Sequence, residues 1–214
     1  MEIVLIPIIA ALVIVGLGKR NQVWISVLLS LIPLAILYTY FTRFGVDQGW
    51  KSIFDLPWIS DKIRFTLGFD GLTGVLLLLT NLMVPVIVMS AIRNDENQVK
   101  LTALTLFMQG ALNGVFMAQD GLMFYIFWEL ALIPIYFIAL LWGGADRIRI
   151  TFKFFIYTLA GSLLMLAALI YLYLQTPLPH NFSLQALYDL QLSEGTQNWV
   201  FWMLFFAFAI KMPI

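Results

Sequence analysis

Seven separate runs of apolar residues, joined by polar connections, dominate this chain of 214 residues. A helix rises 1.5 Å per residue, so about 20 apolar residues cross a hydrocarbon core roughly 30 Å thick. Because 62% of the residues are hydrophobic and 11% are charged, we expect an all-α, polytopic transmembrane helix bundle of about seven helices. The runs lie at 3–17, 23–41, 72–92, 101–118, 122–142, 152–174 and 199–214.

The distribution of lysine and arginine predicts the orientation of this bundle. Positive charge collects on the cytoplasmic side of membrane proteins, so the N-terminus is expected outside. The opposite side carries the long external loop 42–66, where three aspartates dilute four basic residues. Trp50, Pro57 and Trp58 in that loop favour a structured cap at the membrane interface over a floppy connector. The basic residues assigned to the cytoplasmic side are Lys19, Arg20, Arg93, Lys100, Arg147, Arg149 and Lys153.

Composition also limits the cofactors and partners of this chain. It contains no cysteine, which excludes disulfides, iron–sulfur clusters and thiolate metal sites within it. The single histidine, His180, lies in a loop next to prolines and is read as a solvated residue, so no cofactor or metal ion is expected here. The formal net charge is +0, and nothing suggests nucleic acid as a partner.

Glu129 is the most informative single residue, because it interrupts the apolar run 122–142 near its middle. An ionisable group at that depth costs at least about 2.5 kcal/mol, so it is read as functional by default. Tyr125 and Tyr136 lie four residues before and seven residues after it, on the same helical stripe, which should face protein or water. We interpret Glu129 as a proton carrier supported by the two tyrosines; the alternative is a structural glutamate fixed by one hydrogen bond.

Lys211 is the second ionisable residue in an apolar run. Pro213 follows it closely and predicts a broken helix at Lys211-Met212-Pro213, where free carbonyls meet a cation or water. Counted at 1.5 Å per residue, Glu129 and Lys211 lie roughly 12 Å and 20 Å below the outer surface, at comparable depth. The alternative is a lysine that snorkels to the membrane surface. The run stops without a polar flank, so the chain is expected to be truncated.

Lys153, at the start of the run 152–174, is a further candidate: it takes up protons from the cytoplasm, or it is a positive-inside anchor like its arginine neighbours.

Asp70 stands where a helix N-cap belongs. Gly110 and Gly114 are spaced for close helix packing. A polar stripe in the run 101–118 predicts ordered water between helices, as half of a proton wire; it consists of Thr102, Thr105, Gln109 and Asn113.

Four stretches of the chain, 69–72, 124–137, 153–158 and 208–213, resemble the antiporter-like membrane-arm subunits of the proton-pumping NADH:quinone oxidoreductase (complex I), most closely the subunit M branch. The resemblance implies that Glu129 and Lys211 are the central proton-translocating pair. It implies that 1–99 form three leading helices with the external loop, and that 100–214 form the first part of an inverted-repeat unit, truncated in its broken helix.

The same resemblance implies the surroundings of the chain. Its partners are other membrane-arm subunits, protons and the lipid bilayer, in a multi-pass arrangement in a bacterial inner membrane. Flavin, iron–sulfur clusters and quinone are expected in other subunits of a translocase in which this chain performs no redox chemistry. Three alternatives stay open: a subunit of a multisubunit sodium/proton antiporter, a membrane subunit of a hydrogenase complex, and a structural membrane scaffold.

Overall fold

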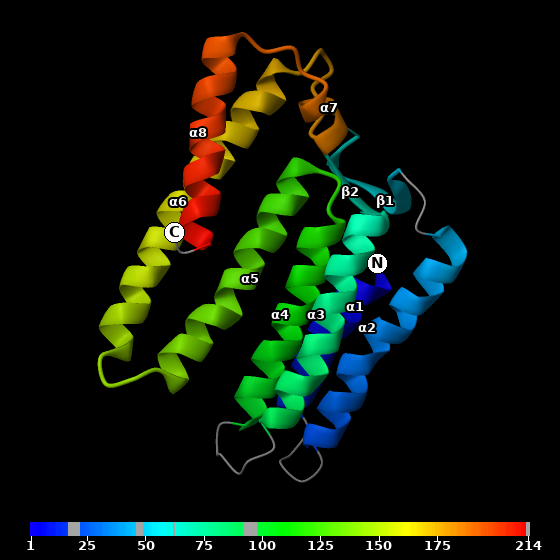
Figure 1. The fold of residues 1–214 in the computed structure, drawn as a ribbon, viewed down its shortest axis with the longest axis vertical. Helices are drawn as coiled ribbons and strands as arrows, with labels where there is room; N and C mark the ends of the chain where they lie inside the picture. Colours follow the sequence, from blue (N-terminus) through cyan, green and yellow to red (C-terminus); the bar gives the residue numbers. More distant parts are fainter. Residues whose placement is uncertain (17–21, 46–48, 62, 92–97, 213–214) are drawn as a thin grey trace.

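The computed structural model describes residues 1–16, 22–45, 49–61, 63–91 and 98–212, and within them it contains helices and one two-stranded sheet (Figure 1). Lys19, Arg20, Arg93, Asp47 and Pro213, on which some of the predictions depend, lie outside these residues. The elements are α1 Glu2–Gly16, α2 Gln22–Phe44, β1 Lys51–Ser60, β2 Ile63–Phe69, α3 Gly71–Ser90, α4 Gln98–Met117, α5 Gly121–Trp142, α6 Arg147–Gln175, α7 Leu184–Tyr188 and α8 Glu194–Lys211.

The predicted helix bundle is confirmed, and the seven apolar runs correspond to α1 to α6 and α8. Among the described residues, five helices are long and apolar enough to cross a membrane, namely α2 to α6. α1 is a shorter apolar helix, and α8 opens with a polar first turn, Glu194-Gly-Thr-Gln197. Length and composition alone therefore support five of the seven predicted spans.

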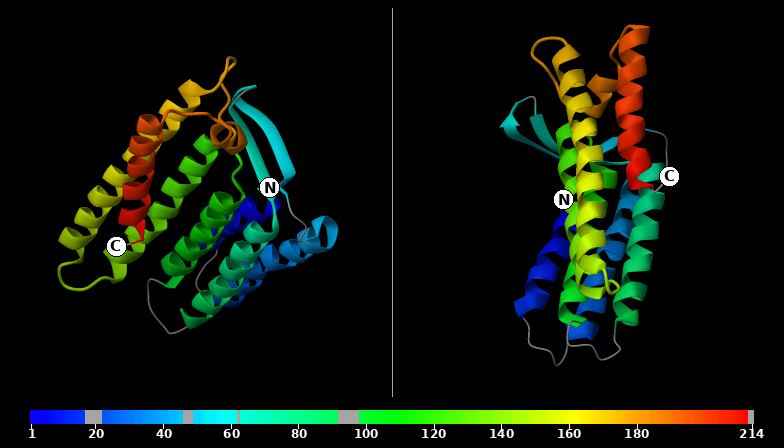
Figure 2. Two further views of the ribbon diagram at one scale, coloured as in Figure 1. Left: turned by 45° about the horizontal axis from the view of Figure 1, so that its top comes forward. Right: turned by 90° about the vertical axis from the view of Figure 1, so that its left-hand side faces the viewer.

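The helices pack as a sequence of neighbours. α1, α2, α3 and α4 form a bundle, α5 packs against α4, α6 packs against α5, and α8 packs against α6. Figure 2 shows α6 and α8 lying side by side at the flank of the molecule. Gly110 and Gly114 allow close packing as predicted, because a Cβ at Gly110 would lie 2.5 Å from Ile8 of α1 and one at Gly114 would lie 2.4 Å from the Phe127 ring of α5.

The external loop is a structured cap, as predicted, but it is a β-hairpin rather than a loop. α2 continues to Phe44, and β1 pairs with β2 in antiparallel register from Lys51 opposite Phe69 to Ser60 opposite Ile63. The strand β2 alternates apolar and other residues, Ile-Arg-Phe-Thr-Leu-Gly-Phe, which is the two-residue period of a strand with one buried face. Apolar runs of helical length, on which the prediction rested, do not reveal this two-residue period.

The hairpin continues into a small network of backbone pairs at one end of the bundle. The Gln119 amide donates to the Thr66 carbonyl over 3.0 Å, which places the α4–α5 turn beside β2. The Leu184 amide then donates to the Gln119 carbonyl over 2.9 Å, and the Gly121 amide donates to the Phe182 carbonyl over 2.8 Å. The start of α5 is thereby tied both to the hairpin and to the segment that connects α6 with α8.

Chain direction groups the connections between helices at two ends. The hairpin, the α4–α5 turn and the α6–α8 connection share one end, where the N-terminus also lies (Figure 1). α5 and α6 are joined at the other end through 143–146. This grouping agrees with the predicted orientation, in which successive helices cross the membrane in opposite directions. The placement of the hairpin end outside the cell stays a prediction.

Candidate functional site

Lys211 is the last residue of α8, and the packing of α8 on α6 decides where its side chain lies. The helix begins at an N-cap, Ser193, whose hydroxyl accepts a hydrogen bond from the Thr196 amide. Near its other end, Ile210 lies against Gly161 of α6, where an added Cβ would lie 3.0 Å from the Ile210 side chain. α8 therefore ends beside the middle of α6 and not at a terminus of the bundle (Figure 1).

The ammonium of Lys211 reaches across to α5 and contacts Trp128. Its Nζ donates a hydrogen bond to the Trp128 backbone carbonyl over 3.3 Å and lies 4.6 Å from the centroid of the indole ring. The indole is held in turn by Phe208, whose ring meets it edge-on with centroids 5.4 Å apart. A cation over an aromatic face is stabilised by the ring quadrupole, and more strongly where water is scarce.

Glu129 follows Trp128 directly and is partly buried in α5. Its Oε1 is fully buried and has no hydrogen-bond partner within the part of the chain that the structure describes. Among the described residues no direct ion pair joins Glu129 and Lys211. The structure thus brings Lys211 to the neighbour of Glu129, and leaves one carboxylate oxygen free to accept a hydrogen bond.

The two tyrosines on the stripe of Glu129 both face α6. The phenol of Tyr125 interacts with the Ser162 side chain and with the charge of Glu129. The ring of Tyr136 meets Phe155 of α6 with centroids 5.2 Å apart. The stripe therefore faces protein, as its periodicity predicts.

Lys153 is not brought to this site. Its side chain is exposed on the second turn of α6, at the end of the bundle opposite the hairpin. Tyr157, one turn further on, is 68% exposed, whereas the adjacent Thr158 is buried. Proton uptake at Lys153 stays a prediction.

The polar stripe of α4 is buried, and direct hydrogen bonds join two of its side chains to neighbouring helices, while the ordered water stays a prediction. The Gln109 Nε2 donates to Asn81 Oδ1 over 2.8 Å and to the Ser30 carbonyl over 3.0 Å. The Asn113 Nδ2 donates to the Ile3 carbonyl over 2.9 Å and to Asn81 Oδ1 over 3.2 Å. We call Asn81, Gln109 and Asn113 the amide cluster. It joins α1, α2, α3 and α4, and Thr102 and Thr105 bond to carbonyls of their own helix.

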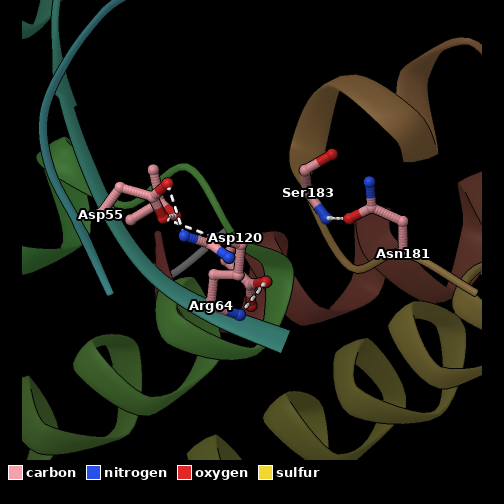
Figure 3. A network of polar contacts seen from close by, with 6 residues as sticks. Asp55, Arg64, Asp120, Asn181 and Ser183 are labelled. Atoms are coloured by element: carbon pink, nitrogen blue, oxygen red, sulfur yellow. Dashed lines mark hydrogen bonds and ion pairs between the residues drawn. The ribbon is translucent and has the colours of Figure 1, made fainter. Parts of the chain in front are cut away.

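Asp120 is a residue that the sequence reasoning missed. It caps α5, and its carboxylate accepts hydrogen bonds from the Leu122 and Met123 amides over 2.9 and 3.3 Å. It also accepts one from the Arg64 amide over 3.4 Å (Figure 3). Only 2% of Asp120 is exposed, and this burial raises its pKa to about 6. The signal was present in the sequence, because Asp-Gly-Leu at 120–122 repeats the triplet at 70–72, where Asp70 caps α3 as predicted.

A cavity of about 600 Å³ lies next to Asp120. The Arg64 guanidinium is directed to Asp55, with contacts of 2.7 and 2.8 Å, and holds the pKa of Asp55 below its usual value. His180 is a loop residue, with Nδ1 2.8 Å from the Thr176 carbonyl. Among the described residues no group of His, Cys, Asp and Glu is arranged to hold a metal ion. The cavity is lined by Trp50, Ser52, Arg64, Thr66, Gln119, Asp120, Asn181, Ser183, Leu184, Gln185 and Tyr188.

The chain is similar to known membrane proteins, and the matches agree with one another. Residues 118–214 match the family described as NADH:quinone oxidoreductase/Mrp antiporter, TM. The chain is 29% identical to NADH-quinone oxidoreductase subunit M of Rhodobacter capsulatus over 231 residues, with 99% of this chain and 45% of the relative covered. It is 33% identical to F(420)H(2) dehydrogenase subunit M of Methanosarcina mazei over 224 residues, with the same two shares.

A solved structure agrees over the same extent. The fold matches a chain of respiratory complex I from Thermus thermophilus with a TM-score of 0.84 and 32% identity, covering 99% of this chain and 44% of that one. The chain thus spans less than half the length of the relatives it matches. The likeness extends over nearly all of its residues, including the segments that carry Glu129 and Lys211. Nearly the whole chain is thus similar to subunit M of NADH-quinone oxidoreductases, and its residues 118–214 match the family that these enzymes share with Mrp antiporters.

Proposed function

We propose that this chain is the N-terminal part of a proton-translocating membrane-arm subunit of respiratory NADH:quinone oxidoreductase, in which Glu129 and Lys211 relay protons. The observation that carries the proposal is the position of the Lys211 ammonium. It leaves the end of α8 and reaches the Trp128 carbonyl of α5, one residue before Glu129, whose Oε1 is buried with no hydrogen-bond partner among the described residues. Ionisable residues inside membrane proteins are costly and mark ion paths.

The proposed mechanism is electrostatic. When quinone reduction elsewhere in the complex perturbs Glu129, its attraction for Lys211 weakens and the lysine passes its proton onward. At an effective dielectric constant near 20, two unit charges 4 Å apart interact by about 4 kcal/mol, and doubling their separation halves this energy. A change of about 2 kcal/mol alters the protonated fraction more than tenfold, which is enough to switch the site.

The supporting residues have separate roles. Tyr125 and Tyr136 place hydroxyl groups on the stripe of Glu129, between α5 and α6. Lys153 is proposed to take up protons at the end of the bundle opposite the hairpin, where its side chain is exposed. No redox cofactor is assigned to this chain, and flavin, iron–sulfur clusters and quinone are assigned to other subunits.

The proposed surroundings follow from the family. The chain is an integral, multi-pass membrane protein, and we propose the bacterial inner membrane as its location and the other membrane-arm subunits as its partners. We also propose the division into three leading helices at 1–99 and the first part of an inverted-repeat unit at 100–214. A sodium/proton antiporter subunit is the second candidate, because the matching family includes Mrp antiporters.

The deciding experiment measures proton uptake and NADH oxidation side by side in membrane vesicles that carry the full-length complex with Glu129→Gln. Assembly is checked on a native gel, and Glu194→Gln, at the polar start of α8, is the matched control. Loss of both activities in an assembled complex supports the relay. Normal pumping in Glu129→Gln would make Glu129 structural, and sodium-dependent transport without NADH oxidation would favour the antiporter.

A further inference from the structure

The contact between Lys211 and Trp128 has two parts that act on the same ammonium. The Trp128 carbonyl supplies a hydrogen-bond acceptor at 3.3 Å, and the indole face supplies an electron-rich surface 4.6 Å from Nζ. A helical carbonyl has two lone pairs, so it can accept the ammonium in addition to its own helical hydrogen bond. Neither part carries a full negative charge, so the lysine is held without being neutralised.

The indole itself is fixed in position by its neighbours. Phe208, one turn before Lys211 on α8, meets the Trp128 ring edge-on at 5.4 Å, and Phe124, one turn before Trp128 on α5, lies 5.6 Å away. Trp128 also packs against the apolar cluster that α6 and α8 form around Met165 and Val200. A ring held from both helices presents its face to the ammonium at a defined place.

Glu129 completes the geometry because it offers a second place for the same ammonium. It is the next residue along α5 after Trp128, and its Oε1 is buried with no hydrogen-bond partner in the part of the chain that the structure describes. A buried carboxylate oxygen with no donor is an unfavourable state, which a hydrogen bond from the ammonium would relieve. The ammonium contacts Trp128, and the Glu129 carboxylate, one residue further along α5, is a second acceptor of opposite charge.

We propose that Trp128 is a positioning residue that holds the charged Lys211 side chain beside Glu129, in a resting position that the lysine leaves when it binds the carboxylate. This inference rests on the proposed relay and deepens it. The switch is a movement of the protonated ammonium between two acceptors, and no covalent bond changes in it. The aromatic face lowers the cost of keeping the lysine charged while it is away from Glu129.

The test replaces Trp128 in the full-length subunit of the assembled complex with tryptophan carrying one, two and three ring fluorines. Fluorine withdraws electrons from the ring face and weakens cation binding stepwise, while the shape of the ring hardly changes. We expect the proton-pumping rate to fall with each fluorine, by roughly tenfold over the series. The matched control is the same series at Trp142 on α5, for which the described residues show no cation over the ring.

Two substitutions support the series. Trp128→Phe keeps an aromatic face and should retain part of the pumping rate, whereas Trp128→Leu should retain less of it than Trp128→Phe. A native gel checks that both variant complexes assemble. If the proton-pumping rate does not change with the number of fluorines on Trp128, or falls equally with fluorines on Trp142, the proposed resting position is wrong. If the series is flat and Glu129→Gln still abolishes pumping, the relay stands and only the role of Trp128 is wrong. Normal pumping in Glu129→Gln would overturn both.

Discussion

Gln109 of α4 donates a 2.8 Å hydrogen bond to Asn81 of α3, and both side chains are fully buried. The same Gln109 amide nitrogen also donates to the Ser30 carbonyl of α2. A single amide thereby links α2, α3 and α4 inside an apolar bundle, where an unmet polar group is costly.

Replacing Gln109 with leucine should destabilise the protein by about 1 to 3 kcal/mol, because Asn81 Oδ1 and the Ser30 carbonyl lose a donor. Thermal unfolding of the detergent-solubilised full-length subunit measures the loss. Thr105→Val is the control and should cost less, since the Thr105 hydroxyl bonds only to the Leu101 carbonyl of its own helix. Equal losses in the two variants would contradict the linking role of Gln109.

Gly114→Ala should destabilise the contact between α4 and α5. The new methyl group would lie 2.4 Å from the Phe127 ring, so the two helices must separate, at a cost of about 1 to 3 kcal/mol. Gly195→Ala, at a helical position with nothing within 4 Å, is the comparison and should be neutral or stabilising by up to about 1 kcal/mol. A stable Gly114→Ala variant would show that this helix contact is looser than the structure has it.

The buried Asp120 predicts a pH-dependent contribution to stability. Its pKa of about 6 in the folded protein lies above its ordinary value of 3.8, so between these values the folded state binds more protons than the unfolded state. The contribution of Asp120 to the free energy of unfolding therefore grows as pH falls from about 6 to about 4, and is lost as pH rises through 6. The full shift corresponds to about 3 kcal/mol, which screening by water in the adjoining cavity reduces to about 1 to 2.

Asp120→Asn should remove this dependence and still cap α5, because asparagine accepts the same backbone amides. The quantity to compare is the difference in melting temperature between wild type and Asp120→Asn at pH 4.5 and pH 7. This comparison cancels the opposite effect of Asp55, whose lowered pKa makes its contribution disappear as pH falls. A difference that does not change with pH would mean that Asp120 titrates normally.

Lys153→Gln should lower the proton-pumping rate without impairing assembly, if protons are taken up there. The side chain is exposed and contributes little to packing, so the loss of charge is the main change. Arg149→Gln, four residues earlier and also exposed, removes a similar charge from the same end of α6 and should leave pumping unchanged. Equal behaviour of the two variants would identify Lys153 as an orientation anchor.

The helices were predictable from the sequence because apolar runs of the right length have few alternatives in a membrane. The hairpin was not, because a two-residue period in Ile63–Phe69 is a weak signal beside runs of 20 apolar residues. The prediction that the polar stripe of α4 is buried was right, and ordered water beside the stripe stays a prediction. Its partner Asn81 lies on another helix, and no pattern within one helix reveals a partner on the next.

The candidate site was predictable in its ionisable residues but not in its contacts. Glu129 and Lys211 stand out because charge is rare in apolar runs. Trp128 does not stand out, since seven tryptophans occur in the chain and only the packing of α8 on α6 brings Lys211, 83 residues away, to this one. The capping role of Asp120 was readable from the repeated Asp-Gly-Leu triplet.

The backbone pairs at the hairpin end have a consequence for the two charges. They fix the first turn of α5 from both sides, and Glu129 lies between this fixed end and Pro134, the first place where the helix lacks a backbone donor. Bending of α5 is therefore concentrated beyond Glu129, towards the α5–α6 connection. Lys211 instead has a long, flexible side chain. In the proposed relay we therefore expect the Glu129 carboxylate to stay in place and the Lys211 ammonium to move.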